Sequence, residues 1–284
     1  MPERAVTAPA VAATIARVLA FCAFVAVTVM ASGALLTAPL EWAARMTGGP
    51  FRIDGFILLG GGLFATALMT RSIDVRPWQD VGLGRPAWRA RRLFEGWTLG
   101  MCTIGAACVV LLLAGWLEVV PDAPGSWIAA ALRITVGLAA AALGEEVICR
   151  GYLLTAVRGL FGPIAAIVLT SLLFGVLHLA NPGATTESVV LVTMAGMFLG
   201  AVRVAFDSLA AAWMAHLAWN WVMAVPLHAP VSGQRFESPG YHMVSSGPEV
   251  ITGGSWGPEG GLAAALAMIG GMAYLYARRR REES

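Results

Sequence analysis

The chain contains no lysine, and charged residues of any kind are scarce. All 19 basic residues are arginines, and charged side chains make up 13% of the 284 residues, against about a quarter in soluble domains. The formal net charge of +2 is too small to suggest a nucleic-acid partner. The four cysteines form no C-x-x-C pair, so we interpret them as small buried apolar residues.

Hydrophobic residues, in contrast, make up 58% of the chain. Several apolar stretches reach the length of about 20 residues that a helix needs to cross a bilayer. Backbone groups in lipid must be satisfied within their own segment, which favours a bundle of helices. The alternating ten-residue segments of a membrane barrel are not visible in the sequence. We therefore predict an all-α polytopic membrane protein with about eight transmembrane helices.

Hydropathy places these predicted helices along the whole chain. They lie at residues 13–36, 55–70, 94–119, 127–157, 161–180, 188–204, 208–227 and 260–277. The length of the first favours a retained helix over a cleaved signal peptide. We divide the chain into an N-terminal part (1–126), a core of four helices (127–227) and a C-terminal part with a long loop, the last helix and a basic tail (228–284).

The distribution of arginine predicts the orientation of these helices. The segment between the second and third helices carries six arginines, and the chain ends ARRRREES. We therefore expect an integral protein of the bacterial cell membrane. Because arginine is retained on the cytoplasmic side, both of its termini are expected in the cytoplasm. The polar stretch 228–259 is then extracytoplasmic, and it is either a lid or a plain connector.

Three charged residues interrupt the helix at 127–157, in the stretch GEEVICRGYLL. Such residues cost about 2.5–3.5 kcal/mol each near the bilayer centre and so need partners. Glu146 and Arg150 are four residues apart, which predicts an ion pair on one helix face. Glu145 points about 100° away from that face and is left available. An uncompensated carboxylate of this kind suits a general acid or base.

Other polar side chains interrupt two later helices. His178 follows Phe174 by one turn, and His216 and Asn220 are spaced to share a helix face. At about 1.5 Å per residue, Glu145 and these three polar side chains fall in one layer near the midplane. Each alone could be a hydrogen bond between helices. Their convergence is more typical of a functional site.

Activated water is the chemistry that this set predicts, because no serine or cysteine nucleophile lies beside a base. Glu145 could take a proton from water that His178 orients, while His216 and Asn220 stabilise an oxyanion. A divalent metal such as zinc, held by Glu145, His178 and His216, is the alternative. The motif H-E-x-x-H is absent, and the spacing leaves both mechanisms open.

Three motifs in order resemble the CPBP family of intramembrane proteases. They are E-E-x-x-x-R at Glu145, Glu146 and Arg150, F-x-x-x-H at Phe174 and His178, and H-x-x-x-N at His216 and Asn220. The family includes the type II CAAX prenyl endopeptidase and bacterial bacteriocin-processing and self-immunity proteins. The resemblance covers about residues 127–227, and GPEGG at 257–261 resembles a loop of some bacterial members.

The resemblance implies an eight-helix fold and hydrolysis of a peptide or membrane protein within or beside the bilayer. It implies that Glu145 and His178 activate water and that His216 and Asn220 bind the oxyanion, in a family commonly described as metalloproteases. Two other functions stay open. One is a non-catalytic membrane binding or bacteriocin-immunity protein on the same scaffold. The other is a proton-coupled transporter, which the lack of an internal repeat disfavours.

Overall fold

The structure is a computed structural model and describes residues 7–46 and 53–283. Every predicted apolar segment contains a helix, which confirms the all-α class. The long helices are α1 (Ala8–Met46), α2 (Asp54–Leu68), α3 (Ala90–Leu113), α4 (Trp127–Glu146), α5 (Leu154–Leu177), α6 (Thr186–Phe206), α7 (Leu209–Ala224) and α9 (Leu262–Glu283). The outermost residues of the two termini, predicted to be cytoplasmic, lie outside the described residues.

Several of these helices are long and apolar enough to cross a membrane. By length and composition, five such stretches occur among the described residues: Ala8–Met46, Asp54–Ile73, Ala90–Leu113, Trp127–Ala180 and Thr186–Phe206. The fourth runs through both α4 and α5. Helix α7 has 16 residues, about 24 Å of rise. The polytopic membrane fold is therefore confirmed, whereas the number of eight spanning helices stays a prediction.

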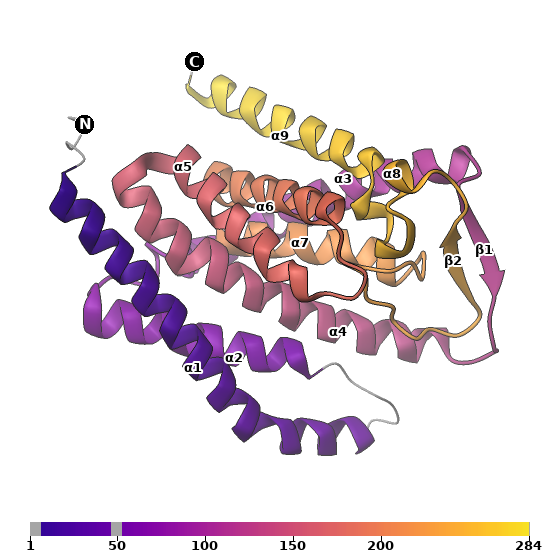
Figure 1. The fold of residues 1–284 in the computed structure, drawn as a ribbon, viewed down its shortest axis with the longest axis horizontal. Helices are drawn as coiled ribbons and strands as arrows, with labels where there is room; N and C mark the ends of the chain where they lie inside the picture. The colour runs from indigo at the N-terminus through magenta and orange to yellow at the C-terminus, as the bar shows by residue number, and fades with distance from the viewer. Residues whose placement is uncertain (1–6, 47–52, 284) are drawn as a thin grey trace.

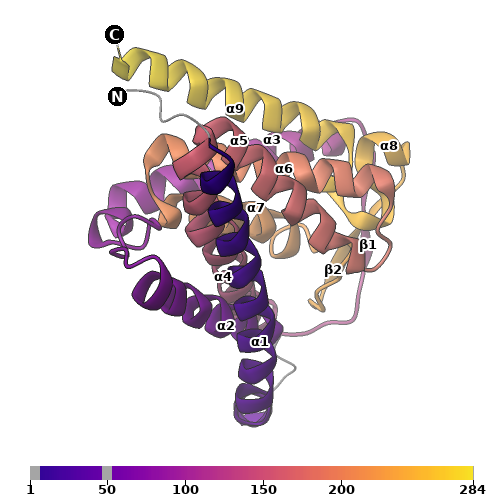
Figure 2. The same ribbon diagram turned by 60° about the vertical axis from the view of Figure 1, so that its left-hand side comes forward.

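The helices form a bundle in which α1 and α2 lie to one side of α4 (Figure 1). Helix α9 lies on the other side, along α3 and α6, and α1 crosses the bundle obliquely in Figure 2. The main core fills the space between α3, α4, α6, α7 and α9. It includes the buried side chains of Ile104, Leu138, Phe198, Leu217 and Met268.

The helix predicted at 127–157 changes its winding after Glu146. Val147–Leu153 forms a π-helix of seven residues, all buried, and α5 follows directly. Bonds from i to i+5 make π turns wider than α turns, and such turns are frequent at functional sites. The chain reverses further on, where Gly162 adopts φ +79° before Pro163. Glycine reaches this left-handed conformation without steric cost.

The helix predicted at 94–119 ends too late. Helix α3 stops at Leu113, and Leu117–Pro121 forms strand β1. It pairs antiparallel with β2 (Tyr241–Ser245), with Leu117 opposite Ser245. The consecutive valines of β1 suit a strand, but the pairing partner lies more than 100 residues away in the sequence. Sequence-local periodicity could not reveal it.

The long loop after α7 is more ordered than its composition predicts. It contains β2, the short helix α8 (Glu249–Thr252) and two 3-10 turns, Gly254–Trp256 and Pro258–Gly260. We call residues 225–261 the cap. The cap lies at the opposite end of the bundle from the start of α1 and the end of α9 (Figure 1).

The cysteines are all free, and their burial partly contradicts the prediction. Cys108 and Cys149 are buried, as predicted, and Cys22 is partly buried. Cys102 is exposed on α3, so its prediction as a buried residue was wrong. Surface positions of a membrane helix are apolar because they face lipid, which is why hydropathy did not distinguish them from the core.

Helices α3 and α7 approach each other at backbone distance. A Cβ added at Gly100 would lie 2.1 Å from the carbonyl oxygen of Ala215, and one at Gly96 would lie 2.2 Å from that of Ala211. Small residues allow membrane helices to pack this closely. Ala215 is the neighbour of His216, so this contact sets the position of a candidate site residue.

We expect Gly100→Ala to force α3 and α7 apart and to cost about 1–3 kcal/mol, as overpacking does. Thermal unfolding of the purified protein in detergent measures the effect. Gly105→Ala is the matched control on the same helix, because a Cβ at Gly105 meets nothing within 4 Å. Equal unfolding temperatures for the two variants would contradict the close contact.

Candidate active site

A buried ion pair lies at the junction of α4 and the π-helix. Glu146 and Arg150 have side chains at 0% exposure, and Oε1 of Glu146 accepts a hydrogen bond of 2.9 Å from an Arg150 guanidinium nitrogen. The other terminal nitrogen donates to the carbonyl of Gly196 at 3.0 Å, and the guanidinium lies 4.3 Å from the ring centroid of Phe174. The predicted pair is confirmed, and these further contacts help to offset its desolvation.

Glu145 is excluded from this pair. Its side chain is 29% exposed, and its Oε2 atom, which is buried, has no hydrogen-bond partner among the described residues. The same atom lies 3.8 Å from Nε2 of His216. One carboxylate is thus compensated and the other is available, as the spacing of the three charges predicts.

His216 lies between the two carboxylates. Its Nδ1 is 3.0 Å from Oε1 of Glu146, while Nε2 faces Glu145. Because a carboxylate only accepts, Nδ1 carries the proton of that hydrogen bond, and Nε2 also carries a proton only when the ring is a cation. With His216 as a cation, two carboxylates are balanced by Arg150 and the imidazolium. The sequence predicted His216 as an oxyanion ligand but not as a bridge between these charges.

His178 lies immediately after α5, in the 3-10 turn His178–Ala180, instead of within a helix as predicted. Its ring packs 4.5 Å from that of Phe174. Nδ1 is 2.8 Å from the carbonyl oxygen of Phe174. A carbonyl only accepts, so this nitrogen is the donor, and Nε2 of the neutral ring keeps a free lone pair.

Two cavities share Asn220 as a lining residue. The smaller, of about 20 Å³, is lined by polar side chains of His178, His216, Asn220, Ser232 and Glu259 among apolar ones. That volume holds about one water molecule. The larger, of about 380 Å³, lies between α1, α2, α4 and the cap, and both Glu145 and Asn220 line it.

The structure therefore brings together most, but not all, of the predicted site residues. His178, His216 and Asn220 surround one small cavity, and His216 contacts both glutamates. Glu145 and His178 line different cavities. The direct cooperation of Glu145 and His178 on one water stays a prediction.

Glu259 is a site residue to which the sequence analysis gave no role. Its side chain is 5% exposed and accepts hydrogen bonds from Nε1 of Trp219 at 2.7 Å and from the backbone and hydroxyl of Ser232 at 2.6 and 2.7 Å. Gly257 precedes it at φ +110°, where a Cβ would lie 2.1 Å from the carbonyl oxygen of Pro230. The GPEGG motif was a signal for this loop, but not for its contacts.

Glu259 supports a tight turn of the cap above the small cavity. Val231 and Gln234 form a two-residue bridge, and the residues between them, Ser232 and Gly233, have φ +49° and +76°. Positive φ at both central positions is typical of a type I′ turn. The amide of Asn181, just after α5, donates to the carbonyl of Ser232 at 3.0 Å. The cap is therefore fixed to α5 and α7 at this turn.

A metal site is not assembled in this arrangement. No group of three or more histidine, cysteine, aspartate or glutamate side chains among the described residues could hold a metal ion. The metal set of Glu145, His178 and His216 stays a prediction, and we derive no step through a metal.

Comparison with known proteins addresses the family. Residues 126–222 match the family model described as type II CAAX prenyl endopeptidase Rce1-like. This segment, about a third of the chain, is therefore similar to the type II CAAX prenyl endopeptidases that the model describes. The matched segment includes all seven predicted site and supporting residues. Searches of curated proteins and of solved structures found no match.

We expect Glu146→Gln to destabilise the protein by about 3–5 kcal/mol, because it leaves the buried charge of Arg150 without its partner. Denaturant unfolding in detergent measures the loss. Arg91→Ala is the control, because it removes an ion pair with Glu95 from an arginine side chain that is 77% exposed, and such surface pairs contribute about 0–1 kcal/mol. Comparable losses in the two variants would show that the buried pair contributes no more than the surface pair.

Proposed function

We propose that the protein is an intramembrane endopeptidase that hydrolyses a peptide bond with water activated by Glu145 and His178. The observation that carries this proposal is the Oε2 atom of Glu145. It is buried without a hydrogen bond and lies 3.8 Å from His216. It also belongs to a side chain that lines a 380 Å³ cavity. A carboxylate oxygen without a hydrogen bond, beside a substrate-sized space, suits a general base.

Water attack is the first step. The water lies beside Asn220, which lines both cavities, with Nε2 of His178 accepting one of its hydrogen bonds. Glu145 removes a proton while the water oxygen forms a bond to the scissile carbonyl carbon.

The carbonyl oxygen then becomes an oxyanion. Asn220 supplies an amide N–H, and the cationic His216 supplies Nε2–H while its Nδ1–H stays bonded to Glu146. Donors fixed in advance stabilise such charge without reorganising, and one donor typically contributes about 10²–10³ in rate. Trp219 lies next in sequence to Asn220, and its bond to Glu259 favours a fixed position for this part of α7.

Collapse of the tetrahedral intermediate completes the reaction. The C–N bond breaks, the carbonyl re-forms, and the leaving amine takes the proton that Glu145 received from water. The carboxylate of Glu145 is regenerated, and no covalent enzyme intermediate forms.

We expect Glu145→Ala and His178→Ala each to lower cleavage by on the order of 10²–10⁴-fold, as loss of an acid–base group does. Comparative proteomics of membrane fractions from wild-type and variant strains reads out the accumulated substrates. Glu249→Ala and His242→Ala are the matched controls, because both residues lie outside the two cavities. Unfolding temperatures establish that all four variants are folded.

A non-catalytic binding or immunity role predicts a different result. In that case the cellular phenotype survives Glu145→Ala, and no peptide accumulates in the variant strain. Normal cleavage by the folded Glu145→Ala protein would refute the assignment of the base.

Metal dependence requires a separate measurement. The mechanism above expects purified protein to keep its cleavage activity after treatment with a chelator. Metal analysis of the same sample accompanies the assay. If removing bound zinc abolishes activity and adding zinc back restores it, the result would instead support a metal site formed by Glu145, His178 and His216.

A further inference from the structure

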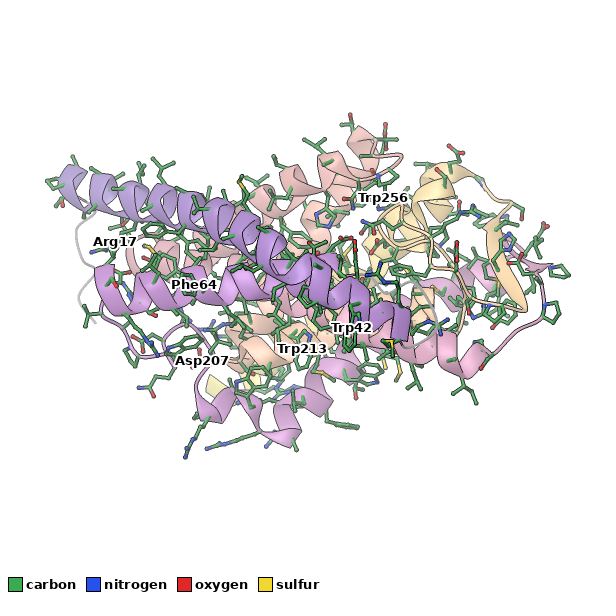
Figure 3. All side chains as sticks on the ribbon, turned by 90° about the horizontal axis from the view of Figure 1, so that it is seen from below. Arg17, Trp42, Phe64, Asp207, Trp213 and Trp256 are labelled. Atoms are coloured by element: carbon green, nitrogen blue, oxygen red, sulfur yellow. The ribbon has the colours of Figure 1, made fainter. Side chains whose placement is uncertain are left out.

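Arginines gather at the end of the bundle opposite the cap. Six of them lie between Arg71, just after α2, and Arg92, in the first turn of α3, and four more, residues 278–281, lie near the end of α9. Arg17 of α1 joins this end through an ion pair of 3.0 Å with Asp74. Figure 3 shows Arg17 and Asp207 toward this end and Trp256 of the cap toward the other.

The cap end carries few arginines among the described residues. Three arginines lie there: Arg45 at the end of α1, Arg133 in the first turns of α4 and Arg235 in the cap. The acidic residues at the same end are Glu118, Asp122, Glu187, Glu237 and Glu249. Arginine counts near the membrane, and not acidic residues, decide orientation. The distribution therefore places the Arg-rich end in the cytoplasm and the cap outside.

The larger cavity belongs to the cap end. Asp54, the first residue of α2, and Asn220, in the last two turns of α7, line it together with Gln234 and Phe236 of the cap. A second, open cleft of about 640 Å³ is also lined by Gln234, together with Asn181 and Arg235.

The walls of the larger cavity are mostly apolar. Val29, Leu58, Leu138, Ala141 and Phe236 supply them. Its volume of about 380 Å³ falls in the range of about 300–1,000 Å³ that is usual for ligand sites. Glu145 and Asn220 are the polar groups of the same cavity to which the proposed reaction assigns roles. An apolar peptide side chain in this space would place its neighbouring peptide bond beside them.

We propose that this site takes an apolar peptide segment from the extracytoplasmic side, through the cavity bordered by Gln234. This proposal rests on the proposed function and names its substrate class. A lipid-modified C-terminus presented in the cytoplasm approaches from the opposite end of the bundle. The substrate is therefore the outer segment of a membrane protein or an exported peptide, and recognition depends on apolar side chains.

Thiol labelling tests the orientation without any assay of cleavage. Gln234→Cys and Glu237→Cys place thiols in the cap, and Arg89→Cys places one at the Arg-rich end. In right-side-out vesicles, we expect a membrane-impermeant maleimide to label the first two and to label Arg89→Cys only after permeabilisation. The unsubstituted chain gives the background of its native cysteines. Labelling of Arg89→Cys alone before permeabilisation would overturn the proposal.

Blocking the cavity tests the path of the substrate. The assay follows the substrates that accumulate in the Glu145→Ala strain. When a bulky impermeant maleimide is added to intact cells, the Gln234→Cys protein should stop cleaving these substrates. The same treatment should leave Glu237→Cys active, because Glu237 lines neither cavity. Unchanged cleavage by fully labelled Gln234→Cys would overturn the proposal. If the unlabelled wild-type protein cleaves none of these substrates, the proposed function itself is refuted.

Discussion

One compensated set of charges makes the centre of this bundle possible. An apolar interior does not tolerate an isolated ion, so Glu146 must have Arg150, and Arg150 must also satisfy its second nitrogen on the carbonyl of Gly196. His216 is added to this set through Glu146. Arg150 belongs to the π-helix after Glu146, whose seven residues are all buried. The fixed position of His216 beside the free carboxylate of Glu145 follows from these contacts.

Local spacing predicted the parts of the site that depend on a single helix. The pairing of Glu146 with Arg150 follows from four-residue spacing, and so does the separation of Glu145 from that pair. The bridge through His216 depends on how α4 and α7 approach each other, and no pattern within either helix contains that distance. The same limit applies to Glu259, whose partners Trp219 and Ser232 are 40 and 27 residues away.

The helices themselves were predictable because a helix that crosses lipid needs a long apolar run of residues, which hydropathy detects directly. Their ends were less so, since an end depends on the partner that replaces the helical hydrogen bonds. Helix α3 gives way to β1 because β2 is present to pair with it. Helix α5 ends before His178, which lies in a 3-10 turn. This turn directly precedes Asn181, whose side chain donates a hydrogen bond to Ser232 of the cap. In both cases the distant cap decides where a helix stops.

The contact between α3 and α7 has a consequence for what counts as one functional unit. The family match covers residues 126–222, whereas Gly96 and Gly100 lie before it and Glu259 lies after it. Yet these residues contact α7, the helix that carries His216 and Asn220. Transplanting the matched segment into another scaffold would transfer the reactive groups without the surfaces that set their spacing. The residues that position the candidate site therefore extend beyond the segment that matches the family model.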